Sequence, residues 1–249
     1  MPAATKRTLF MRKPHSTVTK MAAIALLVTA ILGYLYCSCL GNFFTALHYY
    51  QFENDVQLSQ QDFSVFLHYL SAVLFVYYIC MTVIAGLMIL RRQKQCRPVL
   101  FFMAALKLTA VIMMLVPSPR FAFHFGFESI IEVLLLIHLS RLASAPVSTS
   151  DPLASVTPTI LAAMTAEFIP LLRNIQCLPA EGMGLLSKIS FILLPLSTMF
   201  AFFSLGLHQT QYAYRRQHKP AVVVKLIRPQ PYTPDDISEN ACFPANHAL

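Results

Sequence analysis

The chain of 249 residues is 56% hydrophobic and only 12% charged, with a formal net charge of +8 and a mean hydropathy of +0.58. A soluble domain carries about 25% charged residues, so this composition excludes a soluble globular protein of this size. The positive charges stand in short runs beside apolar blocks, which is typical of orientation signals in membrane proteins and not of nucleic-acid binding.

The apolar residues form blocks of the length that a transmembrane helix requires, which is about 20 residues. In chain order, the predicted helices are residues 21–40, 63–90, 98–116, 121–140 and 185–208. A further block, residues 153–172, contains two prolines and Glu167, and its hydropathy alone leaves it undecided. The sequence therefore predicts an all-α, polytopic integral membrane protein.

The distribution of charge indicates whether residues 153–172 cross the membrane. Residues 6–20, 91–98 and 211–219 are basic, whereas the loop at residues 41–62 contains acidic residues and no Lys or Arg. Positive segments stay on the cytoplasmic side, so both termini are predicted to be cytoplasmic. An even number of crossings is then required, and residues 153–172 become the fifth of six transmembrane helices.

This topology divides the chain into three parts. Residues 1–20 form a basic cytoplasmic tail, residues 21–208 a transmembrane helix bundle, and residues 209–249 a second basic tail that we expect to be disordered. The expected setting is a bacterial inner membrane or a plasma membrane. The expected partners are the lipid bilayer and other membrane subunits.

The predicted fourth helix carries ionisable side chains within an apolar sequence, "FAFHFGFESIIEVLLLIHLSRL" (residues 121–142). At about 100° per residue, His124, Glu128, Glu132 and His138 fall on one face of the helix. Ionisable residues within a bilayer are costly and usually face the bundle interior. The stripe therefore predicts either polar contacts that join helices or a polar cavity between them.

Helix geometry suggests which side chains meet. Glu132 lies about 16 Å below the outer boundary, and Lys107 on the preceding antiparallel helix lies about 13 Å from the inner boundary. In a core about 30 Å thick these depths nearly coincide, so an ion pair is predicted. Glu167 and Glu128 both lie about 10 Å below the outer boundary, and two such carboxylates tend to share a proton. Lys107, Glu128, Glu132 and Glu167 are the candidates for a proton pathway.

The histidines allow a different hypothesis. His124 and His138 lie on one helix face near opposite sides of the membrane, where His68 and His208 could pair with them. These four residues resemble the haem-ligand pattern of transmembrane b-type cytochromes. The resemblance implies haem b as a cofactor and electron transfer as an alternative function. The triplet His124, Glu128 and Glu132 could also bind a divalent metal, although no metal site is predicted for the leading function.

The cysteines give a weaker pattern. Cys37 and Cys39 lie at the outer end of the first predicted helix, and Cys177 lies in the last outer loop. In an oxidising compartment, Cys177 could form a disulfide with Cys37 or Cys39. The spacing of Cys37 and Cys39 is C-x-C and not the C-x-x-C of a redox helix.

The sequence contains none of the usual motifs of soluble enzymes, including nucleotide loops, nucleophile elbows and zinc-protease signatures. We therefore expect a non-enzymatic bundle with a polar cavity that moves protons or a small solute without a cofactor. The alternatives are a haem or thiol redox protein and a scaffold subunit of a membrane assembly.

Overall fold

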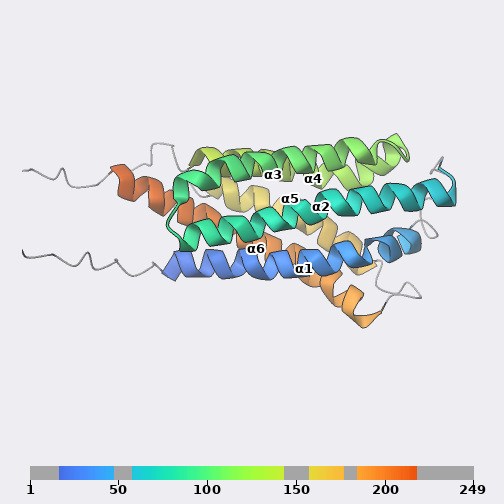
Figure 1. The fold of residues 1–249 in the computed structure, drawn as a ribbon, viewed down its shortest axis with the longest axis horizontal. Helices are drawn as coiled ribbons and strands as arrows, with labels where there is room; N and C mark the ends of the chain where they lie inside the picture. Colours follow the sequence, from blue (N-terminus) through green and yellow to red (C-terminus); the bar gives the residue numbers. More distant parts are fainter. Residues whose placement is uncertain (1–16, 48–57, 143–156, 177–183, 218–249) are drawn as a thin grey trace, which may run out of the picture. The chain divides into compact units, whose positions relative to one another are not determined.

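The computed structural model describes residues 17–47, 58–142, 157–176 and 184–217. Every element of regular structure in these ranges is an α-helix, as the sequence predicts (Figure 1). The helices are α1 (Thr17–Leu47), α2 (Gln60–Ile89), α3 (Gln93–Met114), α4 (Pro119–Leu142), α5 (Thr157–Gln176) and α6 (Leu185–Gln217). The first and last helices extend beyond the predicted bundle limits of 21 and 208, and most of both predicted tails lies outside the described residues.

The six helices run in antiparallel order, so that each returns beside the one before it (Figure 1). Each helix packs on the next in sequence, and α6 closes the ring by packing on α1, with a further contact between α4 and α6. Antiparallel order places the start of α1 and the end of α6 at the same end of the bundle (Figure 1).

Short connections fix two of the helical hairpins. The turn between α2 and α3 uses Arg91, whose φ of 60° lies in the left-handed region that non-glycine residues seldom adopt. Between α3 and α4, the hydroxyl of Ser118 accepts the backbone N–H of Phe121 at 3.0 Å. This bond satisfies one of the N–H groups that a helix start leaves without an intrahelical partner.

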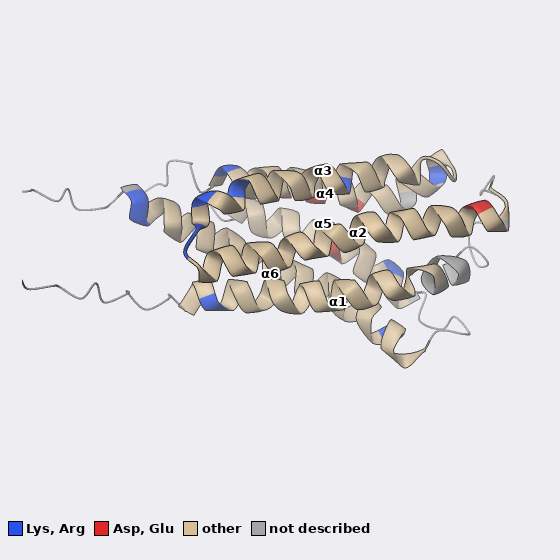
Figure 2. Ribbon diagram, viewed as in Figure 1, with Lys and Arg blue, Asp and Glu red and all other residues tan. Residues whose placement is uncertain are grey.

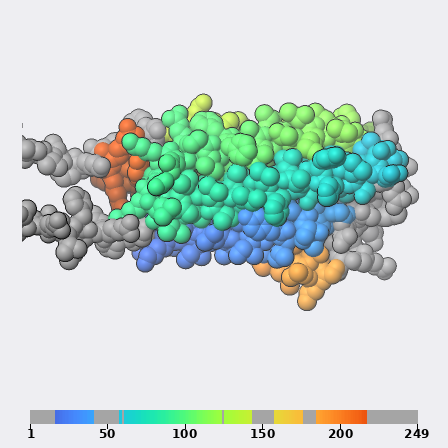
Figure 3. Space-filling view, in the orientation of Figure 1, coloured from blue at the N-terminus to red at the C-terminus, as the bar shows by residue number. Residues whose placement is uncertain are grey.

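Apolar side chains cover the outside of the bundle on every helix. In Figure 3, α1, α2 and α3 lie side by side and form a continuous surface. The large exposed apolar residues include Ile24 and Ile31 of α1, Tyr69 and Phe75 of α2, Phe102 and Ile112 of α3, Phe123 and Leu134 of α4, Leu161 and Phe168 of α5, and Leu186 and Phe200 of α6. An apolar surface of this extent suits contact with lipid.

Four helical segments are long and apolar enough to cross a membrane: Thr17–Gly41, Gln61–Ile89, Gln93–Met114 and Leu185–Arg216. They belong to α1, α2, α3 and α6, and they give the chain the character of a helical membrane protein. The other two helices, α4 and α5, carry the buried carboxylates Glu128, Glu132 and Glu167.

At its C-terminal end, α5 extends one helical turn beyond the predicted block. The block was expected at residues 153–172, whereas the helix spans Thr157–Gln176. The added turn moves Glu167 from near the outer end to the middle of its helix, about 14 Å from the C-terminal end. It also brings Arg173 and Asn174 into the bundle.

The helices α1 and α2 approach closely at Gly33. A Cβ atom added at Gly33 would lie 2.3 Å from the ring of Tyr78, which is closer than any side chain tolerates. Tyr78 is buried, and it lines the interior cavity described below. The missing side chain at Gly33 therefore lets α1 hold Tyr78 against the centre of the bundle.

Candidate functional site

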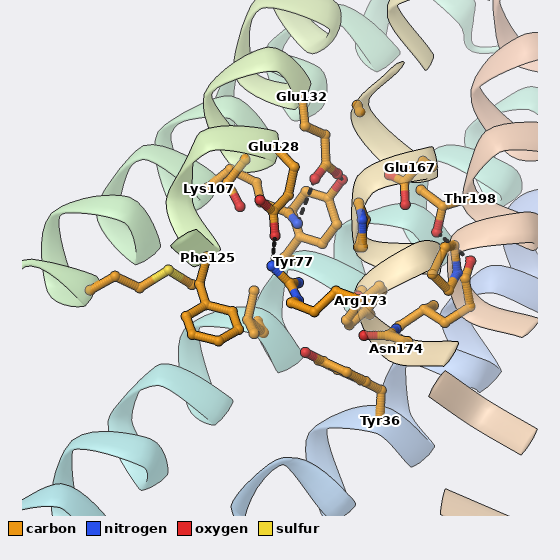
Figure 4. A pocket seen from close by; sticks show the side chains of 18 residues that line it. Tyr36, Tyr77, Lys107, Phe125, Glu128, Glu132, Glu167, Arg173, Asn174 and Thr198 are labelled. Atoms are coloured by element: carbon orange, nitrogen blue, oxygen red, sulfur yellow. Dashed lines mark hydrogen bonds and ion pairs between the residues drawn. The ribbon is translucent and has the colours of Figure 1, made fainter. Parts of the chain in front are cut away.

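A cavity of about 80 Å³ is lined by side chains from all six helices (Figure 4). Its polar lining consists of Tyr36 from α1, Tyr77 and Tyr78 from α2, Lys107 from α3, Glu128, Ser129 and Glu132 from α4, Glu167, Arg173 and Asn174 from α5, and Thr198 from α6. One water molecule needs about 10–15 Å³ of such space, so the cavity has room for a few waters or a small ion.

Glu132 is the centre of a first polar cluster. The Nζ atom of Lys107 lies 2.6 Å from Glu132 Oε2, which is the ion pair that helix depth predicts. The hydroxyl of Tyr77 donates to Glu132 Oε1. Lys107 Nζ also lies 4.7 Å from the centroid of the Tyr77 ring. Both carboxylate oxygens of Glu132 are therefore engaged, and the cluster joins α2, α3 and α4.

Glu128 forms a second cluster with a partner that the sequence did not indicate. Arg173 Nη1 lies 2.7 Å from Glu128 Oε1, and the guanidinium carbon lies 4.5 Å from the centroid of the Phe125 ring. Glu128 Oε2 is buried and has no hydrogen-bond partner among the residues that the structure describes. Arg173 lies one residue beyond the predicted fifth block. Extending the predicted helix by one turn would have included Arg173 as a candidate partner for Glu128.

Glu167 stands apart from both clusters. Its side chain is only 8% exposed and lines the cavity, into which it points in Figure 4. Among the residues that the structure describes, it forms neither an ion pair nor a hydrogen bond. The structure brings Lys107, Glu128, Glu132 and Glu167 to one cavity, but only Glu167 lacks a direct polar partner.

Two helix-interior prolines also line the cavity, Pro170 in α5 and Pro195 in α6. Proline has no N–H, so it cannot donate to the carbonyl four residues earlier in its helix. For Pro195 that carbonyl belongs to Phe191, and Asn174 Nδ2 donates to it at 2.6 Å. Asn174 thus replaces the lost helical bond and joins α5 to α6 beside the cavity.

Three of the four candidate haem ligands, His68, His138 and His208, have side chains that the structure describes. His208 is buried, with Thr19 Oγ1 3.2 Å from Nδ1 and Gln93 Oε1 2.6 Å from Nε2, so iron binding would require one of these bonds to break. His68 is exposed on the surface of α2, whereas His138 is half-buried on α4. His124 belongs to α4, but its side chain lies outside the described set.

The predicted disulfide and the possible metal triplet can be compared with the described residues only in part. Cys37 and Cys39 carry free thiols, and Cys177, their proposed disulfide partner, lies outside the described residues. Within the described part of the chain, no three His, Cys, Asp or Glu residues are placed to hold a metal ion together. The metal triplet on α4 therefore rests on its sequence spacing alone.

Comparisons of the chain with protein-family models, with curated proteins and with solved structures found no match. Any functional inference therefore rests on the chemistry of the cavity and on the faces of the helices.

Proposed function

We propose that all six helices cross the membrane, which is a bacterial inner membrane or a plasma membrane. At 1.5 Å per residue, the 24 residues of α4 and the 20 residues of α5 extend about 36 and about 30 Å, enough to cross the hydrocarbon. Their buried faces hold the carboxylates, while apolar residues occupy their outward faces. These outward residues are Phe123, Phe127, Ile130 and Leu134 of α4, and Leu161, Met164, Phe168, Leu172 and Ile175 of α5.

The charges at the two ends of the bundle support cytoplasmic termini. In Figure 2, Lys and Arg gather at the end that holds the start of α1, the α2–α3 turn and the end of α6. The described basic residues of this end are Lys20, Arg91, Arg92, Lys94, Arg97, Arg141, Arg215 and Arg216. Asp62, Arg120 and Lys188 belong to the opposite end. The positive-inside rule assigns the basic end to the cytoplasm.

This topology has a direct test. Single-cysteine labelling after residues 95, 150 and 215 is expected to report the cytoplasm, and labelling near residues 55 and 180 the opposite side. An outside signal at 215 together with an inside signal at 150 would remove the crossing by α5.

Within this bundle, the proposed function is to move protons across the membrane, alone or linked to a small solute. The observation that carries the proposal is the charge balance of the cavity. Among the described residues that line it, three carboxylates (Glu128, Glu132 and Glu167) stand against two cations (Lys107 and Arg173). An ionised carboxylate without a cation beside it is costly in a low-dielectric interior, and taking up a proton removes that cost. Glu167 is therefore the proposed proton carrier, and the two ion pairs hold the helices around it.

The test uses the purified chain in sealed lipid vesicles with an internal pH-sensitive dye. A pH gradient is imposed in potassium salts with a potassium ionophore to hold the voltage, and the measurement is repeated with sodium present. The wild type is expected to dissipate the gradient faster than Glu167→Gln in at least one of the two salts. Asp62→Asn is the matched control, because Asp62 is an exposed carboxylate at the start of α2, away from the cavity. Equal decay for wild type and Glu167→Gln in both salts would contradict the proposal.

A further inference from the structure

Beside Glu167, the backbone carbonyl of Ala166 lacks the N–H that would normally donate to it within the helix. Pro170 cannot donate to the carbonyl of Ala166, which lies four residues earlier in α5. No side chain among the described residues donates to this carbonyl, in contrast to the Phe191 carbonyl, which receives Asn174. Ala166, Glu167 and Pro170 all line the cavity. The helix therefore has a carbonyl without its usual helical N–H donor one residue before the Glu167 carboxylate.

Further oxygen atoms complete this environment. The hydroxyl of Thr198 on α6 donates its proton to the Leu194 carbonyl at 2.8 Å, which leaves the lone pairs of Oγ1 for another partner. Glu128 Oε2 is buried without a hydrogen-bond partner in the described part of the chain. Thr198 and Glu128 both line the cavity. Carboxylate, hydroxyl and carbonyl oxygens are the ligands that hard cations select.

The net charge of the groups that line the cavity indicates which charge a bound ligand should carry. Lys107 and Arg173 offset the charges of Glu132 and Glu128, so one carboxylate charge is left at Glu167. A monovalent cation neutralises one charge, and a cavity of about 80 Å³ accommodates it with a few waters.

We propose that the cavity binds a monovalent alkali cation at the Glu167 carboxylate, the Ala166 carbonyl and Thr198 Oγ1. The inference rests on the proposed proton transport and assigns its solute class. When the cation enters, the Glu167 carboxyl releases its proton, and when the proton returns, the cation leaves. One positive charge replaces another, so the cavity keeps the same net charge in both states, which is the charge balance of one-for-one exchange between a monovalent cation and a proton.

The binding test uses the full-length chain in detergent, without vesicles. Its melting temperature is measured in sodium, potassium and choline chloride at equal ionic strength, and proton release is followed with a dye in weak buffer. At a sodium concentration of about 100 Kd, sodium is expected to raise the melting temperature by at least about 5 °C over choline. Each bound sodium ion is expected to release close to one proton.

Two pairs of variants locate the site. Glu167→Gln is expected to lose both the sodium-dependent stabilisation and the proton release, whereas Asp62→Asn keeps both. Thr198→Val removes Oγ1 with little change of shape and is expected to weaken sodium binding about tenfold. Thr165→Val is its matched control, because Thr165 is exposed on the outer face of α5 and also donates to a helix carbonyl.

Equal melting temperatures in sodium, potassium and choline for the wild type would overturn the inference, as would a sodium response that survives in Glu167→Gln. Proton flux in sodium-free vesicles without sodium binding in detergent would also overturn it, while leaving the proposed proton transport in place. Sodium binding with proton release but without flux would support the cation site and contradict the transport function.

Discussion

Two polar clusters line the same cavity, and each combines a carboxylate, a cation and an aromatic ring. They differ in how many of the carboxylate oxygens have a partner. Around Glu132, the ammonium of Lys107 and the hydroxyl of Tyr77 engage both carboxylate oxygens. Around Glu128, Arg173 engages one oxygen and the other is buried without a partner among the described residues. Each cation also lies over an aromatic ring, Tyr77 in the first cluster and Phe125 in the second.

The difference separates structural polarity from polarity available to a ligand. A buried polar group lowers stability when it is left unsatisfied, so a cluster whose groups are all paired contributes to folding. A new ligand would have to compete with the contacts that the cluster already forms. The Glu132 cluster joins three helices in this way. The free oxygen of Glu128 and the whole carboxylate of Glu167 keep acceptor capacity inside the cavity. Replacing each carboxylate should therefore lower the stability most at Glu132, less at Glu128 and least at Glu167.

The largest effect is expected at the Glu132 cluster. Lys107→Ala or Glu132→Ala alone leaves a charged group in the bundle interior, and breaking a buried ion pair costs about 3–5 kcal/mol in soluble proteins. The double variant removes both charges and is expected to recover a large part of the loss. Melting temperatures of the wild type, both single variants and the double variant in one detergent measure this. Strictly additive losses would show that the two side chains do not support each other.

The Lys107–Glu132 pair could be predicted from sequence because a short hairpin joins its two helices. With only a few residues between α3 and α4, the depth of each side chain follows from counting residues at a fixed rise. The six apolar blocks, the all-α class and the inward face of Glu128 and Glu132 could be predicted from the same regularities. These predictions need only hydropathy and helix periodicity.

The rest depended on contacts that no local pattern encodes. The fifth helix continues one turn past the predicted end of its block, because the buried carboxylate of Glu128 makes the charge of Arg173 acceptable inside the bundle. The partners of His208, Thr19 and Gln93, come from α1 and α3, far away in the chain. Pairing between distant helices depends on their rotation and tilt, which a single sequence does not state.

A second double-variant cycle tests whether the Glu128 cluster is weaker. Glu128→Ala and Arg173→Ala are each expected to cost about 1–3 kcal/mol, with a coupling of about 1 kcal/mol between them. Glu128→Ala also removes an oxygen that is buried without a partner among the described residues, so its loss is expected near the lower end of this range. Arg173→Ala leaves the Glu128 carboxylate without its cation and is expected near the upper end. The comparison with Lys107 and Glu132 uses the same detergent and the same melting assay. A coupling at least as large as that of the first pair would contradict the ranking of the clusters.

Tyr77→Phe sharpens the comparison from within the first cluster. The substitution keeps the ring beneath Lys107 and removes only the hydroxyl that donates to Glu132. Hydrogen bonds to charged groups contribute about 1.5–3 kcal/mol, and a loss near the lower limit is expected because Lys107 still holds the other oxygen. Tyr69→Phe is the control, since Tyr69 is exposed on the outer surface of α2. Equal melting temperatures for Tyr77→Phe and Tyr69→Phe would show that the Tyr77 hydroxyl does not complete the cluster.

The smallest effect is expected at Glu167, where the same chemical change can be compared at two carboxylates. Glu132→Gln replaces the charge that Lys107 faces and is expected to cost about 3 kcal/mol. Glu167→Gln breaks no ion pair or hydrogen bond that the described residues form, and the neutral amide is easier to bury than a carboxylate. Its melting temperature in sodium-free buffer should correspond to a change within about 0.5 kcal/mol of the wild type. Loss of stability similar to that of Glu132→Gln would mean that Glu167 holds the helices together, which would contradict its role as the carboxylate that binds a proton or a cation.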